Sequence, residues 1–349
     1  MSTWHAQLTD LEATVVDELQ SDFPIAKRPF RVIADRFDAD EEAVLAATTD
    51  LVENGILRRV GPVLNPPVIG SSALAAVSVP DGQFEQASSF VNSYDEVNHN
   101  YRRDHQWNMW FVVTAHSRTR RNQIIEAIEA ETGSEVLTLP MRRQYYIGLE
   151  FPVVNDDQLA WHGTELTEAE KRQISGRSLS ISEMEKRILL EIQNGFELTA
   201  TPYREIAKAA GEPTKTVCQA IESLSERNAI KRIGCVVNHH AVGFDENCMV
   251  VWDVPDYRLD TAGTAAGSYS AVTYCCHRPR RSAMDWPYNL FTMIHGRSAE
   301  AVEATIDELA AACLPYSHER LHTTAALKQT GTRYSELMET DDNRTELHT

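Results

Sequence analysis

The sequence predicts an α+β protein made of two tandem copies of one module, in which a winged helix-turn-helix precedes a ferredoxin-like (βαββαβ) sandwich. Its 349 residues exceed the usual size of a single core. Residues of the first half recur at a fixed distance in the second half. Within each half, apolar residues first follow helical spacing and then form short apolar runs. We therefore expect two homologous halves, each with a helical part and a sheet part.

The internal repeat is carried by residues at matching positions. Residues near the start of each half, and residues of the first predicted strand, recur 173 positions further on. The matched sets are Gln20, Phe23, Pro29 and Phe30 with Gln193, Phe196, Pro202 and Tyr203, and Arg59-Val60-Gly61 with Arg232-Ile233-Gly234. At a slightly larger offset, Asn108-Met109-Trp110-Phe111 corresponds to Asn289-Leu290-Phe291-Thr292. So regular an offset indicates a duplicated module.

The order of elements in the first half defines the predicted fold. Apolar residues at helical spacing predict helices around 11–19, 32–34 and 44–52, and a strand begins at 56–60. Three helices and a strand pair make a winged helix-turn-helix. Beyond it we expect a strand at 74–79, a helix at 84–94, a strand at 109–114, a helix near 124–128 and a closing strand at 145–151. Because ferredoxin-like sheets leave an edge free, we expect the two halves to pair.

The domain boundaries follow from these patterns. We expect a winged helix-turn-helix at 1–65, a ferredoxin-like domain at 66–154 and a polar linker at 155–182. The second copy should occupy 183–238 and 239–335, with a polar tail at 336–349.

Composition predicts an ordered cytoplasmic protein without a membrane partner. Hydrophobic residues make up 42%, yet no apolar run is long enough to span a bilayer, and residues 1–5 lack the layout of a secretion signal. All six cysteines lie in the second half without regular spacing, so reduced thiols are expected. The net charge of −18, with only seven lysines, is typical of proteins that work in concentrated salt, and we hypothesise a halophilic source.

Each half resembles the Lrp/AsnC regulators, which would imply DNA binding. Charge argues against that function. The recognition helix of the first half would begin in the acidic run 38–45, and no Lys or Arg occurs between Arg36 and Arg58. In the second half, 212–226 contains only Lys215 as a cation. Because recognition of DNA rests on several phosphate contacts, we expect no nucleic-acid partner, and a haem- or metabolite-sensing regulator stays as the alternative from another class.

A narrower resemblance lies in the sheet parts. Segments 99–105 (HNYRRDH) and 107–111 (WNMWF), together with 275–280 (CCHRPR) and 285–296 (DWPYNLFTMIHG), are similar to the signature segments of siroheme decarboxylases, including their fused two-module form. Segment 23–30 and Arg58-Arg59-Val60-Gly61 fit the same family. The resemblance covers nearly all of both halves, and 285–296 is its most specific part.

The resemblance implies a carbon-carbon lyase that removes two acetate carboxyl groups from siroheme without oxidation, giving 12,18-didecarboxysiroheme for haem synthesis. It also implies that no separate cofactor, metal site or dioxygen is needed, because siroheme brings its own iron. The equivalent step of denitrifier haem synthesis is the alternative within enzymes. The module further implies pairing through the ferredoxin-like sheets, as a homodimer or as a pseudo-heterodimer of the fused halves.

Candidate site residues follow from the chemistry of a polycarboxylated ring. Arginines can hold its carboxylates in bidentate contacts, although any single one can equally pair with the surplus Asp and Glu. His99 and Tyr101, two apart on a predicted strand, share one face and are the candidates for proton donor, macrocycle contact or iron ligand. The substrate-binding candidates are Arg59, Arg102, Arg103, Arg142, Arg143, Trp107, Arg278, Trp286 and Tyr288. We expect Arg102, Arg103, Arg142 and His99 to surround one cavity.

Other residues have a structural interpretation. Trp110 lies in an apolar run and is expected in the core. Asn108 and Asn289 hold equivalent places and are expected to anchor backbone. The set Cys235, His239, His240 and Cys248 matches no standard zinc spacing, and His295 is expected to end a strand. Because the run at 275–279 lacks the family's tyrosine and one arginine, we expect His99 and Tyr101 to perform the chemistry while the second half helps build the pocket.

Overall fold

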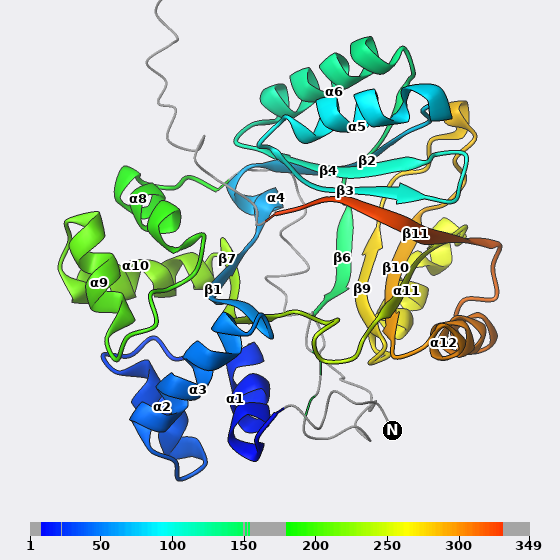
Figure 1. Ribbon diagram of the computed structural model, residues 1–349. Coiled ribbons are helices and arrows are strands. Elements are labelled where there is room, and N and C mark those ends of the chain that lie inside the picture. The colour runs from blue at the N-terminus through cyan, green and yellow to red at the C-terminus, as the bar shows by residue number, and fades with distance from the viewer. Residues whose placement is uncertain (1–7, 22, 149–150, 152, 154–178, 331–349) are drawn as a thin grey trace, which may run out of the picture.

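The computed structural model describes residues 8–21, 23–148, 151, 153 and 179–330. Over these residues the two halves repeat one order of elements, helical part first and sheet part second (Figure 1). The expected tail at 336–349 lies outside the described residues, as does the expected linker as far as position 178. No described helix is long and apolar enough to cross a bilayer.

Each helical part has three helices and one strand. In the first half these are α1 (Asp10–Ser21), α2 (Pro29–Arg36), α3 (Glu41–Glu53) and β1 (Leu57–Leu64), followed by the short α4 (Pro66–Ile69). In the second half they are α8 (Glu183–Ile192), α9 (Pro202–Ala210), α10 (Thr214–Glu226) and β7 (Ile230–Val237). Pro29 and Pro202 begin α2 and α9, where a missing N–H breaks no helical hydrogen bond.

The wing strands differ from the expectation. We predicted a strand pair within each helical part, but β1 pairs antiparallel with β7, and Gly61 lies opposite Gly234. The sequence pattern of a strand does not show which strand it pairs with. The pairing of β1 with β7 therefore could not be predicted from the sequence. The repeated glycines allow it: a Cβ on Gly61 would lie 2.6 Å from Cα of Gly195, and a Cβ on Gly234 would lie 2.6 Å from the carbonyl oxygen of Leu19. β7 thus packs against α1 of the first half, and β1 packs against the segment that follows α8 in the second half.

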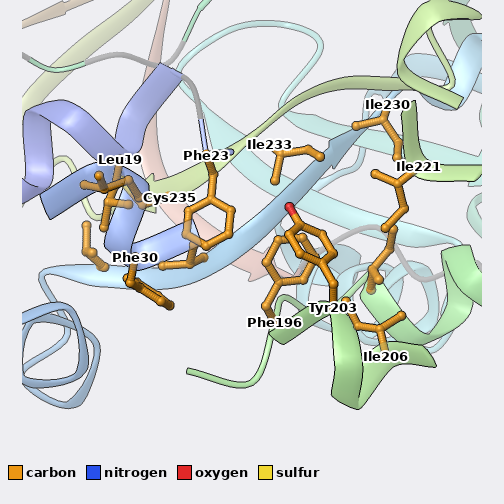
Figure 2. Close-up of a cluster of buried hydrophobic side chains, with 14 of the residues drawn as sticks. Leu19, Phe23, Phe30, Phe196, Tyr203, Ile206, Ile221, Ile230, Ile233 and Cys235 are labelled. Carbon is orange, nitrogen blue, oxygen red and sulfur yellow. The ribbon is translucent and has the colours of Figure 1, made fainter. Parts of the chain in front are cut away.

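The repeated aromatic residues meet in one core between the two helical parts. Phe23 lies 5.3 Å from Phe30 and 5.6 Å from Phe196, and Phe196 lies 5.4 Å from Tyr203, measured between ring centroids. Figure 2 shows these rings beside Ile233 and Cys235. Because the residues at matching positions of both halves fill one apolar cluster, the helical parts stabilise each other by burial.

The sheet parts also repeat. The first holds β2 (Ser71–Val77), α5 (Phe84–Asn92), β3 (Val97–Arg103), β4 (Met109–Ala115), α6 (Arg118–Thr132), β5 (Val136–Leu139) and β6 (Arg143–Ile147). The second holds β8 (Glu246–Trp252), α11 (Leu259–Gly267), β9 (Val272–His277), β10 (Leu290–Gly296), α12 (Ala299–Ala312) and β11 (His318–Gln329). The strands form one continuous sheet in the order β5-β2-β4-β3-β11-β8-β10-β9-β6, which contains the ferredoxin-like order twice. Its two parts, β5-β2-β4-β3 and β11-β8-β10-β9-β6, are called the first and the second sheet below.

The two halves exchange their last strands. The predicted closing strand at 145–151 does not close the first sheet: that position belongs to β5, and β6 pairs instead with β9 of the second half. In return, β11 pairs with β8 through residues 318–322 and with β3 through residues 323–329. The expectation that the halves pair is confirmed, and the exchanged strands cover the edges at β3 and at β9.

The two sheets pack face to face with helices outside. Figure 1 shows α5 and α6 over the outer face of the first sheet and α11 and α12 beside the second. Trp110 of β4 and Trp286 meet between the sheets, with ring centroids 5.5 Å apart. Trp110 is 1% exposed, which confirms its predicted place in the core.

Candidate active site

The inner face of β3 carries the two predicted catalytic residues. His99 and Tyr101 are half-buried, and their rings are parallel within 10°, with centroids 6.1 Å apart. The Tyr101 hydroxyl lies 3.5 Å from Nδ1 of His99 and accepts a hydrogen bond from Nε2 of Gln329 at 3.3 Å. The predicted shared face is confirmed, since residues two apart on a strand point to the same side.

Arg103 continues this row into the space between the sheets. It is 4% exposed, its Nη1 donates to the main-chain carbonyl of Leu321, and its Nε is buried with no partner. The guanidinium lies 5.7 Å from the Tyr101 ring centroid. Within the described residues Arg103 has no carboxylate partner, and burial lowers its pKa to about 10. A buried cation without a counter-ion favours binding of an anion beside Tyr101.

Arg58, on the wing strand β1, lies near His99 of β3. Its side chain is exposed and pairs with no carboxylate in the described part of the chain. Burial lowers the pKa of His99, and the nearby Arg58 lowers it further. Burial also lowers the pKa of His239 to about 4, with His240 and then Arg58 as further causes. Arg58 therefore lies near His99 of the first half and near His239 of the second, and burial favours the neutral form of the His99 imidazole.

The second half supplies two imidazoles near Arg58. His239 follows β7, and His295 lies near the end of β10, where the sequence predicted a strand-end residue. Their ring centroids are 5.1 Å apart. Nδ1 of His295 lies 2.8 Å from Oγ1 of Thr273, whereas Nε2 of His239 is buried with no hydrogen-bond partner among the residues that the structure describes. Sequence reasoning weighed both residues and assigned neither to the site, because nothing local in the chain links them to β3.

Arg102 lies on the opposite face of β3 from His99. Its Nη2 is 2.8 Å from Asp81, and its guanidinium lies 4.3 Å from the Phe84 ring centroid. The expected single cluster of Arg102, Arg103, Arg142 and His99 is therefore not formed, because adjacent residues of a strand alternate between faces. Of these four, the structure brings together His99 and Arg103.

Arg142 and Arg143 line a separate cavity of about 660 Å³ on the outer side of the second sheet, together with His277 and Arg280. Arg143 pairs with Asp260 at 2.5 Å, and Arg280 pairs with Asp253 at 2.7 Å. Of the two predicted substrate contacts in this cavity, Arg143 is thus paired with an acidic residue.

The other predicted substrate contacts are spread over both sheets and the wing. Arg59 lies within β1, where Nη1 donates to the carbonyl of Pro62 at 2.9 Å. Trp286 and Tyr288 are buried between the sheets, and the half-buried Trp107 packs against their cluster. The indole nitrogens of Trp107 and Trp286 are buried and find no hydrogen-bond partner in the described part of the chain.

Asn108 and Asn289 anchor backbone, as predicted. Asn108 accepts from the main-chain N–H of Val79 at 2.9 Å and donates to its carbonyl at 2.8 Å. Asn289 makes the same pair of bonds with Val254, at 3.0 Å and 2.9 Å. Each asparagine thereby joins the end of one strand to the start of another, a role that both copies share.

The recognition helix of the first half, α3, carries little charge suited to DNA. Asp40 caps α3 by accepting from the N–H groups of Glu42 and Ala43, and Glu41 pairs with Arg28 at 2.6 Å. The start of α3, which would approach a duplex, therefore presents carboxylates.

Taken together, the fold and site define a fused two-module protein of the AsnC type, with imidazole, phenol and guanidinium groups placed between its sheet domains. A family model for the AsnC-like ligand binding domain matches residues 69–146 and 241–328, and a model for the siroheme decarboxylase NirDL-like HTH domain matches 12–58 and 185–230. The chain belongs to the siroheme decarboxylase family, in its fused NirDL form.

Individual relatives agree over nearly the whole length. The chain is 33% identical to the siroheme decarboxylase NirDL subunit of Paracoccus denitrificans over 333 residues, which cover 95% of this chain and 99% of that one. It is 27% identical to the siroheme decarboxylase of Hydrogenobacter thermophilus, over 90% of this chain and 92% of that one.

A solved structure agrees as well. The crystal structure of siroheme decarboxylase NirDL matches with a TM-score of 0.71 at 25% identity, over 94% of this chain and 96% of that one. A second crystal structure of NirDL, in complex with an iron-uroporphyrin III analogue, matches with a TM-score of 0.70.

Proposed function

We propose that this protein decarboxylates siroheme, converting two acetate side chains to methyl groups and giving 12,18-didecarboxysiroheme for haem synthesis. The observation that carries the proposal is the row of His99, Tyr101 and Arg103 on the inner face of β3, where Arg103 has no carboxylate partner among the described residues. The chain that carries this row matches NirDL decarboxylases over 95% of its length. The row combines a cation for carboxylate binding with two groups that can transfer a proton.

The reaction needs three contributions from the protein. In each step the bond between the methylene and carboxylate carbons breaks, carbon dioxide leaves, and the electron pair enters the conjugated ring system. One proton then adds to the methylene carbon, so that a methyl group forms and no oxidant or reductant is consumed. The protein must hold the carboxylates, exclude water around the departing group and supply the proton.

His99, Tyr101 and Arg103 can meet these needs. Arg103, buried and without a carboxylate partner, would hold an acetate or propionate carboxylate of the ring. If the Tyr101 hydroxyl donates to Nδ1 of His99, the imidazole carries its proton on Nε2 and can give it to the substrate carbon. The phenol proton could then replace the lost one. We infer that no separate cofactor takes part, because the tetrapyrrole itself accepts the electron pair.

We also infer a reducing, cytoplasmic location. All six cysteines are free thiols, and burial raises the pKa of five of them, in Cys248 and Cys313 to about 11. Unpaired, protonated thiols are typical of proteins in a reducing compartment.

The test is turnover of siroheme under nitrogen, followed by mass spectrometry for the loss of two carbon dioxide units. We expect the wild-type protein to form the doubly decarboxylated ring, and His99→Ala to bind siroheme but to react at least about a hundredfold more slowly. His322→Ala, which changes an exposed histidine of β11, should retain full turnover. Binding of siroheme without mass loss by the wild type would contradict the proposal and favour a sensor.

A further inference from the structure

Gln20, a residue of the internal repeat, fixes the backbone beyond the end of β6. It lies in the last turn of α1 and is 4% exposed. Its Nε2 donates to the main-chain carbonyl of Phe151 at 2.9 Å, and its Oε1 accepts from the main-chain N–H of the same residue at 2.6 Å. One turn earlier, Oδ1 of Asp17 accepts from the N–H of Val153 at 3.0 Å. Because buried peptide groups need hydrogen-bond partners, α1 holds this part of the chain in one place.

The side chain of Phe151 reaches into the second half. It is 2% exposed, and its ring lies 5.7 Å from the ring of His239, tilted by 27°. The ring of His295 lies edge-on at 5.4 Å and that of Phe244 at 5.0 Å, measured between centroids. The guanidinium of Arg297 covers Phe244 in turn, 4.5 Å from its ring centroid. Phe151 therefore contacts both second-half imidazoles of the candidate site.

The orientation of His239 depends on these ring contacts. Its buried Nε2 finds no hydrogen-bond partner among the described residues, whereas Nδ1 of His295 lies 2.8 Å from Oγ1 of Thr273. The ring of His239 also lies 4.1 Å from that of His240, which is exposed. An imidazole that no hydrogen bond fixes takes its orientation from the side chains that it packs against. Because Phe151 is buried and held by its backbone, it is the firmer of the neighbours of His239.

The end of α1 packs against the wing strand of the second half. Nη1 of Arg232 donates to the main-chain carbonyl of Gln20. A Cβ on Gly234 would lie 2.7 Å from the same oxygen, so the close approach of β7 to α1 requires glycine there. Through Asn238, β7 leads directly into His239. The helix that holds Phe151 and the strand that leads to His239 are therefore parts of one packed unit.

We propose that Gln20 and Phe151 are positioning residues: the helical part of the first half holds Phe151 through Gln20, and Phe151 orients the imidazoles of His239 and His295 for the bound ring. This proposal rests on the proposed function for its substrate. A helical part whose recognition helix presents carboxylates thus contributes to the reaction, because it fixes one wall of the site.

The charges around these imidazoles come from both halves. Burial lowers the pKa of His239 to about 4, with His240 and Arg58 lowering it further and Asp245 raising it. Burial, His239 and His240 lower the pKa of His295 to about 3. Loss of the covering aromatic ring would admit water and raise both pKa values towards the ordinary 6.5.

The test separates orientation from stability by matched substitutions. Gln20→Leu removes both hydrogen bonds to the backbone of Phe151, and Gln20→Glu retains the acceptor. Phe151→Leu removes the ring and leaves the backbone bonds in place. The controls are Glu18→Gln, at a carboxylate of α1 that pairs with Arg36, and Phe90→Leu, at a half-buried ring of α5.

Histidine-selective NMR on the full chain without ligand follows the two imidazoles, whose signals are assigned with His239→Gln and His295→Gln. We expect both rings to stay neutral down to about pH 5 in the wild type and in both controls. In Gln20→Leu and Phe151→Leu we expect them to take up a proton between about pH 5 and 7, with a smaller change in Gln20→Glu.

The affinity for siroheme, titrated anaerobically by absorbance, gives the second measurement. It should fall at least about fivefold in Gln20→Leu and Phe151→Leu and less than about twofold in the controls, because a displaced group no longer meets the ligand. Phe90→Leu should lower the melting temperature without either effect, which separates positioning from general destabilisation.

Other outcomes overturn the proposal. One is unchanged titration of both imidazoles with unchanged affinity in folded Gln20→Leu and Phe151→Leu; another is an equal loss of affinity in Phe90→Leu. If Gln20→Leu did not fold, Phe151→Leu would decide, because it keeps the backbone hydrogen bonds. If the wild type bound siroheme without releasing carbon dioxide, or bound none, the proposed function would fail. The titration of the imidazoles would still show whether Gln20 and Phe151 orient them.

Discussion

The rings of His99 and Tyr101 lie parallel on one face of β3, with centroids 6.1 Å apart and the phenol oxygen 3.5 Å from Nδ1 of the imidazole. This contact is at the long limit of a hydrogen bond, so it would tighten only when a ligand fills the site. The pair can therefore transfer a proton to a bound ligand. Removal of either polar group should lower the reaction rate more than it lowers the stability of the folded protein.

Tyr101→Phe tests the phenol. The substitution keeps the ring and removes the hydroxyl that contacts His99 and Gln329. We expect kcat to fall by about tenfold to a hundredfold, because the imidazole loses its source of a replacement proton, while KM changes little. Tyr257→Phe, at a side chain that is 83% exposed, is the control and should leave both constants unchanged. A lower affinity with unchanged kcat would instead assign Tyr101 to binding.

Asn289→Ala tests the backbone anchor of the second half. Asn289 is 1% exposed, and its loss leaves the N–H and carbonyl of Val254 without these partners. We expect the free energy of unfolding in urea to fall by about 2 to 3 kcal/mol. Asn108→Ala should cost less, because this half-buried site admits water, and Asn122→Ala, at an exposed helix position, should change stability by less than about 0.5 kcal/mol. Equal, small effects in all three would contradict the anchoring role.

Gly263→Ala tests the exchanged strand. Alanine normally stabilises a helix relative to glycine, but a Cβ on Gly263 of α11 would lie 2.4 Å from the ring of Tyr145 on β6. We expect the free energy of unfolding to fall by about 1 to 3 kcal/mol, because β6 would have to move away from α11 and from its partner strand β9. Gly82→Ala, whose Cβ would meet nothing within 4 Å, is the matched control. A stabilised Gly263→Ala protein would show that β6 is not held against α11.

The second-half histidines predict acid sensitivity. Burial, helped by the neighbouring imidazoles, lowers the pKa of His295 to about 3 from an ordinary 6.5. The folded state therefore binds fewer protons than the unfolded state below pH 6.5, and stability falls as the pH drops from about 6.5 towards 3. Each unit of depression corresponds to about 1.4 kcal/mol.

Urea unfolding at pH 8 and pH 5 measures this effect. We expect the loss of stability between the two values to be smaller in His295→Gln than in the wild type, and unchanged in His322→Gln, at an exposed position. An identical loss in all three proteins would mean that His295 becomes protonated as readily in the folded state as in the unfolded one.

Net charge predicts a dependence on salt. At −18, the compact chain repels itself, and salt screens that repulsion. We expect the melting temperature and turnover to rise from dilute buffer to molar KCl. Full stability and activity in dilute buffer would argue against the hypothesis of a halophilic source.

Local pattern was sufficient for the parts of this protein that depend on residues near one another in the chain. The duplicated module, its helices and most of its strands follow from periodicity and from the 173-residue offset. The shared face of His99 and Tyr101 and the anchoring by Asn108 and Asn289 follow for the same reason, since a strand alternates its faces whatever its partner is. The expected reaction, decarboxylation of siroheme, came from the family resemblance of segments 99–111 and 285–296.

Tertiary structure alone decided which segments meet. Nothing in residues 143–147 distinguishes a strand that closes its own sheet from one that pairs with β9, because edge strands offer the same hydrogen bonds to any partner. The same exchange places Arg142 in a different cavity, and the pairing of β1 with β7 brings His239 beside Arg58. Arg102, in contrast, points away from His99 because successive residues of one strand alternate between faces. Contacts between residues more than a hundred positions apart depend on how two complete sheets pack. That packing cannot be inferred from the sequence of any single segment.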